Sequence, residues 1–578
     1  MRRRTIAAAL LIAVAVCVAA LVLSLPPPSR RLTAPPGDPR ELAGALHVHT
    51  VRSDGAGTVE EVAAAAARAR LQFVVFTDHG DATRPPEPPQ YRSGVLCVDG
   101  VEISTTGGHY IALGLDRPAP YRLAGEPRAV VEDVARLGGF GIVAHPDSAK
   151  GELRWNAWSE PFDALEWLNA DSQWRDEPPR AIAGAVASYL FRGPEAIASL
   201  FDRPQVLSRW DAATRRRRVI ALAGHDAHAR IGLRGNWEPG TGDYSLALPS
   251  YEAAFRAFAM RVRLATPPTG DAVRDARLLL DAFKAGHVYT VIDAQAGPAR
   301  LTFTARGPDG AGEGGDDLVA TRPVTLAAHV PDTPGVTLLL VRNGRVAATA
   351  EGPSLTHEHR PDGTDTTTVY RVEARLQGAP AWRVPWIVSN PIRISAAERE
   401  APAPTEPPPA EATRPVPKSV ESTPWLLERD AKSTASIEPR PSRGVRLTYA
   451  LEGGEPRGQY AAAVLTFAPG AFEGWDRIRF RGSASREMRV SVQVREPQNG
   501  RRWIRSVVLF PDARDIVVRM DEMRVPEPVL AGRPPRQELA SVLFVVDTTN
   551  TVPGTRGTVE IEDVRFERDA SQRATTSR

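Results

Sequence analysis

Residues 45–55 read ALHVHTVRSDG, and this stretch predicts how the first half of the chain folds. The apolar run ends in His47 and His49, and an extended chain places alternate side chains on the same face. Two imidazoles on one face are typical of a metal site. Because such pairs are also common on solvent-exposed strands, the prediction depends on whether ligand-type residues follow other strands as well.

Ligand-type residues also end four further apolar runs. FVVFTDH ends in Asp78 and His79, VLCVDGVE in Glu102, GIVAH in His145, and VIALAGHDAH in Asp226 and His228. In a barrel of parallel strands the carboxyl ends converge on one rim, where active sites are built. We therefore predict an α/β region over residues 42–296, in which Thr58 and Glu61 form a capping box for an alanine-rich helix.

The ordered motifs H-x-H-T-x-x-S-D-G, T-D-H, a Glu and a His, A-H-P and G-x-D-x-H resemble those of a known family. It is the PHP (polymerase and histidinol phosphatase) family of metal-dependent phosphoesterases, and the resemblance covers about residues 46–293. It implies a distorted (β/α)7 TIM-like barrel that holds two or three divalent ions. It implies His47, His49, Glu102 and Asp226 as ligands of one ion, Asp54, His79 and His228 of a second, and Glu102, His109 and His145 of a third. Asp226 and His228 would also be catalytic.

Imidazole and carboxylate ligands suit Zn²⁺, Mn²⁺ or Fe²⁺. The chain has two cysteines, Cys17 and Cys97, which argues against both a disulfide framework and cysteine-ligated zinc. The expected reaction is hydrolysis of a small phosphorylated substrate by a metal-bound hydroxide. Arg52, Lys150 and Arg230 adjoin the ligand motifs and are candidates for binding the phosphate, the alternative for each being a solvated loop charge.

Three arginines precede an uncharged run over residues 6–25, which is long enough to span a bilayer. With a Pro-rich spacer it makes up residues 1–41, and it predicts a membrane anchor with the body outside the cytoplasmic membrane, in the periplasm. A cleaved signal peptide, which would leave the protein secreted, is the alternative. The net charge of +3 over 578 residues gives no nucleic-acid footprint.

Short β-rich runs predict two all-β sandwich domains, over residues 297–396 and 420–568, the second with a jelly-roll form. A Pro-rich linker over residues 397–419 separates them, and a disordered tail follows at 569–578. The last domain is similar to galactose-binding-like and carbohydrate-binding jelly rolls, which implies a carbohydrate or cell-surface polymer as partner. Because the linker has no apolar periodicity, we expect this domain to be uncoupled from the barrel.

These observations predict a membrane-anchored metal-dependent phosphoesterase, either a phosphatase or a phosphodiesterase. One alternative is a metal hydrolase that acts on another ester or an amide. Another is a non-catalytic protein that binds a surface polymer. The complete ligand set argues against the last, because a site that has lost its activity usually loses ligands too.

Overall fold

The computed structural model describes residues 25–569 except 34–36, 233–244, 247, 332, 362–366, 379–381, 397–409, 416–424, 442–443, 455–457, 469, 498–499 and 526–531. The described part contains seven α-helices, one short 3-10 helix and 35 strands. Residues 1–24 of the predicted anchor, most of the predicted linker and the tail from residue 570 lie outside it. Among the described residues, no helix combines the length and apolar character needed to cross a membrane.

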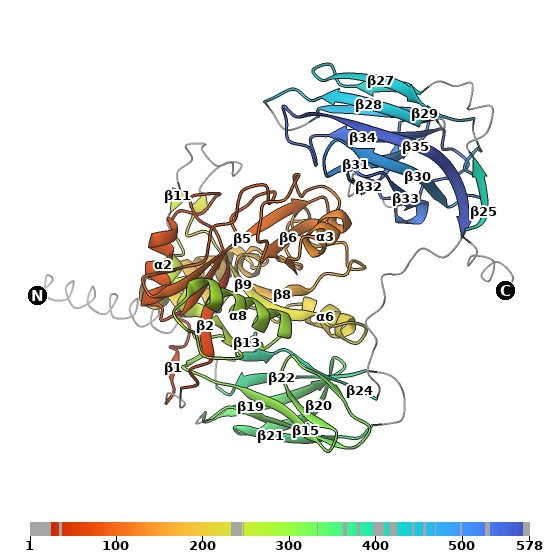
Figure 1. Cartoon of the computed structure of the whole chain (residues 1–578). Helices are drawn as coiled ribbons and strands as arrows, with labels where there is room; N and C mark the ends of the chain where they lie inside the picture. Colours follow the sequence, from red (N-terminus) through yellow and green to blue (C-terminus); the bar gives the residue numbers. More distant parts are fainter. Residues whose placement is uncertain are drawn as a thin grey trace, which may run out of the picture.

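Seven strands close a barrel, and helix α2 (Val59–Arg68) lies beside it (Figure 1). They pair in the order β2 (Glu41–Val48), β3 (Phe73–Phe76), β5 (Val95–Thr105), β6 (Gly108–Leu113), β7 (Phe140–Val143), β8 (Ala164–Asn169) and β9 (Ile220–Ala227), and β9 pairs back to β2. β6 runs antiparallel to both of its neighbours, whereas the other pairs in the barrel are parallel.

The predicted (β/α)7 TIM-like barrel is therefore wrong, and so is the α/β class, since strands far outnumber helices in the described part. Thr106 and Gly107 alone connect β5 to β6, so the two strands form a tight hairpin that leaves no room for a helix. The chain also passes from β3 to β5 and from β7 to β8 without a helix. A strand-end motif predicts where a ligand lies, but not which way the next strand runs.

The helices cover parts of the barrel. They are α2 (Val59–Arg68), α3 (Pro127–Arg136), α4 (Ala170–Arg175), α5 (Pro179–Ala198), α6 (Val206–Thr214), α7 (Tyr251–Ala257) and α8 (Ala272–Ala285). The predicted capping box is confirmed, because the Thr58 side chain accepts from the Glu61 N–H and the Glu61 side chain accepts from the Thr58 N–H.

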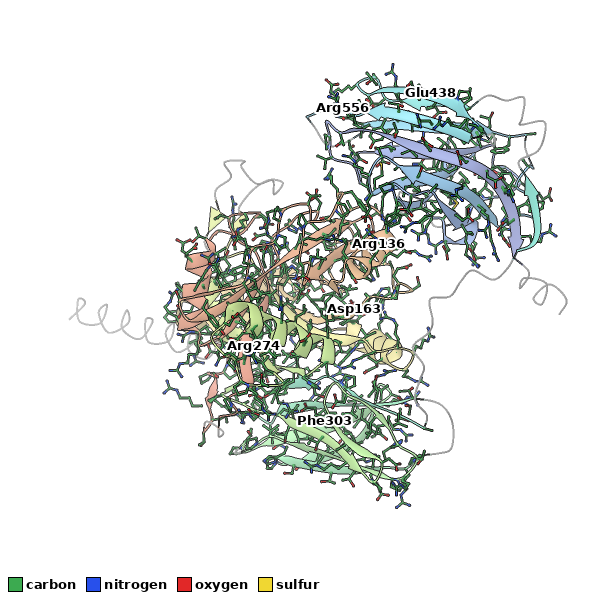
Figure 2. All side chains as sticks on the ribbon, in the orientation of Figure 1. Arg136, Asp163, Arg274, Phe303, Glu438 and Arg556 are labelled. Carbon is green, nitrogen blue, oxygen red and sulfur yellow. The ribbon has the colours of Figure 1, made fainter. Side chains whose placement is uncertain are left out.

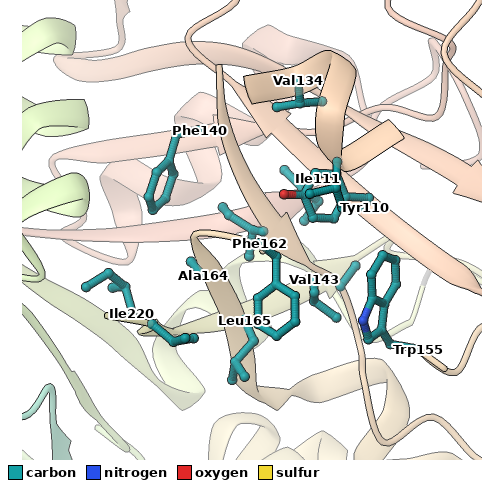
Figure 3. Packing of buried hydrophobic residues seen from close by; sticks show 14 of the residues in the cluster. Tyr110, Ile111, Val134, Phe140, Val143, Trp155, Phe162, Ala164, Leu165 and Ile220 are labelled. Carbon is teal, nitrogen blue, oxygen red and sulfur yellow. The ribbon is translucent and has the colours of Figure 1, made fainter. Parts of the chain in front are cut away.

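Large side chains fill the space between β6, β7, β8 and α3 (Figure 3). Tyr110 stacks on Trp155 with ring centroids 5.7 Å apart, and Trp155 meets Phe162 edge to face. A Cβ atom at Gly141 of β7 would lie 1.9 Å from the Tyr110 hydroxyl, so only glycine fits there. This dense packing gives the neighbouring site a rigid base.

The barrel sheet continues into the next β-rich region. β2 pairs with β12 (Ala259–Arg263), which leads through β13 (Val288–Val291) to β23 (Ile387–Ser389), β22 (Thr368–Leu376), β24 (Ile392–Ser395), β17 (Asp317–Val319), β19 (Val336–Arg342) and β20 (Arg345–Glu351). A second layer contains β16 (Gly310–Glu313), β15 (Thr302–Gly307), β18 (Val324–His329) and β21 (Ser354–His359). One of the two sheets formed by residues 297–396 is thus continuous with the barrel sheet. Short pairs are β1 (Arg30–Arg31) with β14 (Ala296–Gly297), β4 (Gln90–Arg92) with β5, and β10 (Ile231–Gly232) with β11 (Ser245–Leu246).

The C-terminal unit has two sheets. One contains β27 (Thr434–Arg440), β28 (Gly444–Ala450), β35 (Arg556–Asp569), β30 (Arg477–Ala484) and β33 (Arg514–Arg519), with β25 (Ala410–Pro415) paired to β35. The other contains β26 (Leu426–Arg429), β29 (Tyr460–Thr466), β34 (Ser541–Asp547), β31 (Met488–Arg495) and β32 (Arg502–Leu509), and the short 3-10 helix η1 (Met520–Glu522) follows β33. Alternate residues of β31, from Met488 to Val494, face the shared core.

This unit docks on α3 of the barrel (Figure 1). Arg489 of β31 is buried, and its Nε and Nη2 donate to Asp133 of α3 at 2.6 and 3.1 Å. Arg505 of β32 donates to Glu132 at 2.6 Å. Figure 2 shows Arg136, at the end of α3, on the side that faces the C-terminal unit. The expectation of an uncoupled domain is wrong, because these side chains join the C-terminal unit to α3.

Candidate metal centre

The structure brings all nine predicted metal ligands together at the barrel. Their nitrogen and oxygen atoms form four overlapping groups, each with its ligand atoms within 4.8 Å of one another. The groups are His49, Asp54, His79 and His228; His47, His49 and Glu102; His47, His145 and Asp226; and His79, Glu102 and His109. These sets differ in detail from the three that the resemblance implies, because His47, His49 and His79 each belong to two groups.

Glu102 of β5 lies at the middle of the cluster. Its Oε1 is 2.8 Å from His109 Nδ1 and 2.8 Å from His145 Nε2. Its Oε2 is 3.2 Å from His47 Nε2, and it lies within 3.3 Å of nitrogens of His49 and His79. The side chain is only 1% exposed. One buried carboxylate therefore faces five imidazoles, as a bridging metal ligand would.

Three buried atoms of the cluster test whether metal ions fit there. Glu102 Oε2 lies 3.2 Å from His47 Nε2 and 3.3 Å from His49 Nε2, yet none of these three atoms makes a hydrogen bond of acceptable geometry among the described residues. A buried polar atom without a partner costs about 1–3 kcal/mol. These three atoms converge within 4.8 Å of one another, so a single divalent cation between them would satisfy all three.

The charges in the cluster also call for cations. Burial by itself would lower the pKa of His47, but Asp226, Glu166 and Glu102 together raise it well above its ordinary value. Burial would also lower the pKa of His79, but the charges of Glu102 and Asp54 outweigh burial and raise this pKa to about 9. Without metal ions, protons on His47 and His79 would offset part of the charge of the buried carboxylates. Metal ions would take over that role.

Three ligand residues have left-handed backbone conformations. φ is 64° at His47, 30° at His145 and 49° at Asp226. The pairing of β2 also shifts register between Leu46 and Val48, so His47 occupies a bulge and is not in a regular strand. The alternation predicted for His47 and His49 is thus interrupted, although their rings do meet, with centroids 5.1 Å apart. Such conformations cost about 1–3 kcal/mol each and are typical of functional sites.

Glu166 of β8 is a member of this site that the sequence analysis missed. Its Oε1 accepts from His47 Nδ1 at 2.7 Å, and its Oε2 accepts from the His145 N–H at 2.7 Å and from Asn169 Nδ2 at 2.8 Å. The bond to Nδ1 leaves the Nε2 lone pair of His47 directed at the cluster. A signal was available, because Glu166 is a lone carboxylate inside the apolar run ALEWLN.

Asp78 has a supporting role. Its Oδ1 accepts from the Thr50 N–H at 2.7 Å and from Ser53 Oγ at 2.7 Å, and its Oδ2 accepts from Thr50 Oγ1 at 2.8 Å. These bonds hold the loop after His49, which carries Asp54. Asp78 therefore positions a candidate ligand through the backbone.

The three predicted phosphate-binding residues differ in their placement. Arg52 lines a cavity of about 350 Å³ together with His79. Lys150 is exposed and Arg230 is half-buried, and neither belongs to the lining of that cavity. Only Arg52 is thus brought to a pocket at the metal centre.

No family model matches the sequence, and no curated protein matches it. Among solved structures, a two-domain Bacteroides vulgatus protein described as containing a predicted PHP-like metal-dependent phosphoesterase is 15% identical. It covers 64% of this chain and 98% of its own, with a TM-score of 0.29. A family 11 carbohydrate-binding module from Clostridium thermocellum is 13% identical and covers 27% of this chain and 95% of its own, with a TM-score of 0.21. These scores are low, so the function is argued from the site alone.

Proposed function

We propose that this protein is a metal-dependent hydrolase of phosphoester bonds. The observation that carries the proposal is the convergence of unpartnered, buried His47 Nε2, His49 Nε2 and Glu102 Oε2 inside a larger group of imidazoles and carboxylates. The donor set suits two to three ions of Zn²⁺, Mn²⁺ or Fe²⁺. Bound ions of this kind activate water near neutral pH and stabilise charge on phosphoryl oxygens.

The side chains of the site hold fixed orientations for this chemistry. His228 Nδ1 donates to the Asp226 carbonyl at 2.9 Å, so His228 Nε2 is free to face Asp54, 3.2 Å away. His47 and His49 are fully buried, whereas the side chain of His79 is 35% exposed. Substrate would therefore approach from the side of His79, where Arg52 lines the cavity and is the candidate to contact the phosphate. Asp226 and His228 are the candidates for catalytic ligands.

Two parts of the proposal depend on the sequence alone. The apolar run over residues 6–25 supports a membrane anchor with the body in the periplasm, or secretion if the segment is cleaved. The resemblance of the C-terminal unit to galactose-binding-like and carbohydrate-binding jelly rolls supports a carbohydrate or cell-surface polymer as its partner. Neither is needed for the hydrolase proposal.

Elemental analysis and activity of the full chain test the function. We expect two to three divalent ions per chain, hydrolysis of a phosphomonoester or phosphodiester, and loss of that activity when a chelator removes the ions. Asp226→Ala and His49→Ala should each lower kcat/KM about a hundredfold or more, because each removes a metal ligand.

His329→Ala is the matched control, since His329 is an exposed histidine of β18, far from the barrel motifs in the sequence. Circular dichroism should show the same fold in all variants. A chain that hydrolyses phosphoesters without metal, or hydrolyses only carboxyl esters or amides, would contradict the proposed function.

A further inference from the structure

The cavity beside the metal centre contains chemistry that the ligand cluster does not use. Its lining joins the candidate ligand His79 to three arginines, Arg52, Arg84 and Arg117. Its volume of about 350 Å³ suits a small organic molecule. Whether each arginine has a carboxylate partner indicates what kind of molecule the cavity binds.

Arg52 and Arg84 are paired with carboxylates, and Arg52 is already assigned to the scissile phosphate. Arg84 Nη2 lies 2.9 Å from Asp99, and Arg52 pairs with both Glu87 and Asp99. Asp99 further accepts from the Glu87 N–H at 2.9 Å. Two guanidinium groups and two carboxylates thus form one balanced network in the wall of the cavity.

Asp81, another carboxylate of the lining, is also paired. Its Oδ2 accepts from Arg122 Nε at 2.8 Å, and its Oδ1 accepts from Thr83. It therefore has little charge to offer Arg117.

Arg117 is left as a cation without a counter-charge. It follows β6, is exposed, and lines the cavity, and within the described part of the chain it makes no hydrogen bond, ion pair or ring contact. A guanidinium keeps its charge at any physiological pH and binds planar or tetrahedral anions through paired N–H groups. An apolar strip that includes Val101, Ala112 and Leu115 also lines the cavity.

We propose that this cavity receives the leaving group of the phosphoester and that Arg117 binds an anionic group on it. The substrate class is then a small organic phosphoester with a second negative charge, either a carboxylate or a second phosphate, separated from the scissile phosphate by an apolar body. This inference rests on the proposed function, because the scissile phosphate is assigned to the metal side of the cavity.

Three aryl phosphates that differ only at the para position test the inference with the full, metal-loaded chain. They are 4-nitrophenyl phosphate, 4-carboxyphenyl phosphate and benzene-1,4-diyl bisphosphate. Arg117→Ala should raise KM about tenfold for the two anionic probes and leave KM within about twofold for the nitro probe. Arg117→Lys should restore part of the loss. The probe with the larger effect identifies carboxylate or phosphate as the preferred anion.

Arg274→Ala, which removes an exposed arginine of α8, is the matched control and should leave all three KM values unchanged. A readout without turnover is calorimetric binding of 4-carboxybenzylphosphonate and 4-nitrobenzylphosphonate, and Arg117→Ala should weaken only the first. An equal effect on charged and neutral probes, or no effect on any, overturns the role of Arg117. Absence of hydrolysis of all three probes by metal-loaded wild-type chain counts instead against the proposed function.

Discussion

Glu166 contacts two candidate ligand residues, His47 and His145, although it belongs to none of the candidate ligand groups. It binds His47 Nδ1 through one oxygen and accepts two N–H donors through the other. Glu166→Gln keeps the volume but removes the charge and presents an amide N–H to a neighbouring donor. We expect metal affinity to fall about 10–100-fold, as for other carboxylates that orient a histidine ligand.

Competition with a chelating dye measures this effect. Glu60→Gln, on the exposed side of α2, is the control and should bind metal like the wild type. Unchanged affinity in the Glu166 variant would show that His47 holds its orientation without this carboxylate.

At the residue scale, the sequence predicts which side chains gather, because each apolar strand brings a ligand type to its end. It does not predict the bulge at His47 or the left-handed backbone at His145 and Asp226. Those conformations arise because the surrounding barrel holds the backbone in them. Local preference alone would place these residues in extended conformations. Glu166 was missed because it lies within its strand and not at the end.

At the element scale, the sequence predicts most strand ends, but β5 continues past Glu102 to Thr105, and the direction of β6 could not be predicted. A ligand at the end of a parallel strand and a ligand at the start of an antiparallel one reach the same rim. His109 is near the start of β6, so its position looks the same in either arrangement. The order of motifs therefore predicts that the ligands share one site, but it cannot distinguish a (β/α)7 barrel from the mixed barrel found here.

Gly224 of β9 tests how strands β8 and β9 jointly shape the site. A Cβ atom there would lie 1.8 Å from Glu166 Oε1, so Gly224→Ala must displace the Glu166 side chain. We expect a loss of about 1–3 kcal/mol in the free energy of unfolding, together with weaker metal binding. Denaturant unfolding and the same dye competition measure the two effects.

Gly151→Ala is the control, because nothing lies within 4 Å of a Cβ atom at that position. It should change neither quantity. If Gly224→Ala lowers stability and leaves metal affinity intact, Glu166 can move without disturbing His47.

At the scale of the whole molecule, the C-terminal unit contributes to the barrel through contacts that the linker composition cannot predict. Arg122 donates to Asp81 in the cavity wall and also to the Thr548 carbonyl of the C-terminal unit, at 2.8 and 2.7 Å. Asn550 donates to the carbonyls of Arg122 and Ala124. Arg122 thus links the cavity wall directly to the C-terminal unit, so substrate binding in the cavity should depend on the docking of that unit.

Arg489→Met tests that dependence. Asp133 is 1% exposed and keeps Arg136 Nη2 at 3.2 Å and the Tyr121 hydroxyl at 2.7 Å, so Arg489→Met removes one of its two cationic partners. The cost should lie near the low end of the about 3–5 kcal/mol typical of a broken buried pair. We expect coupled unfolding of the barrel and the C-terminal unit in the wild type. In the variant the C-terminal unit should unfold at a lower temperature than the barrel, and KM for a phosphoester should rise as Arg122 loses its contact with Thr548. Arg514→Met, which removes an exposed ion pair in the same unit, is the control and should leave both unfolding and KM nearly unchanged. The double variant Arg489→Met with Asp133→Asn also removes the buried carboxylate charge and should recover much of the stability. If Arg489→Met changes neither unfolding nor KM, the docked arrangement contributes nothing to the cavity, and the C-terminal unit acts independently of the barrel.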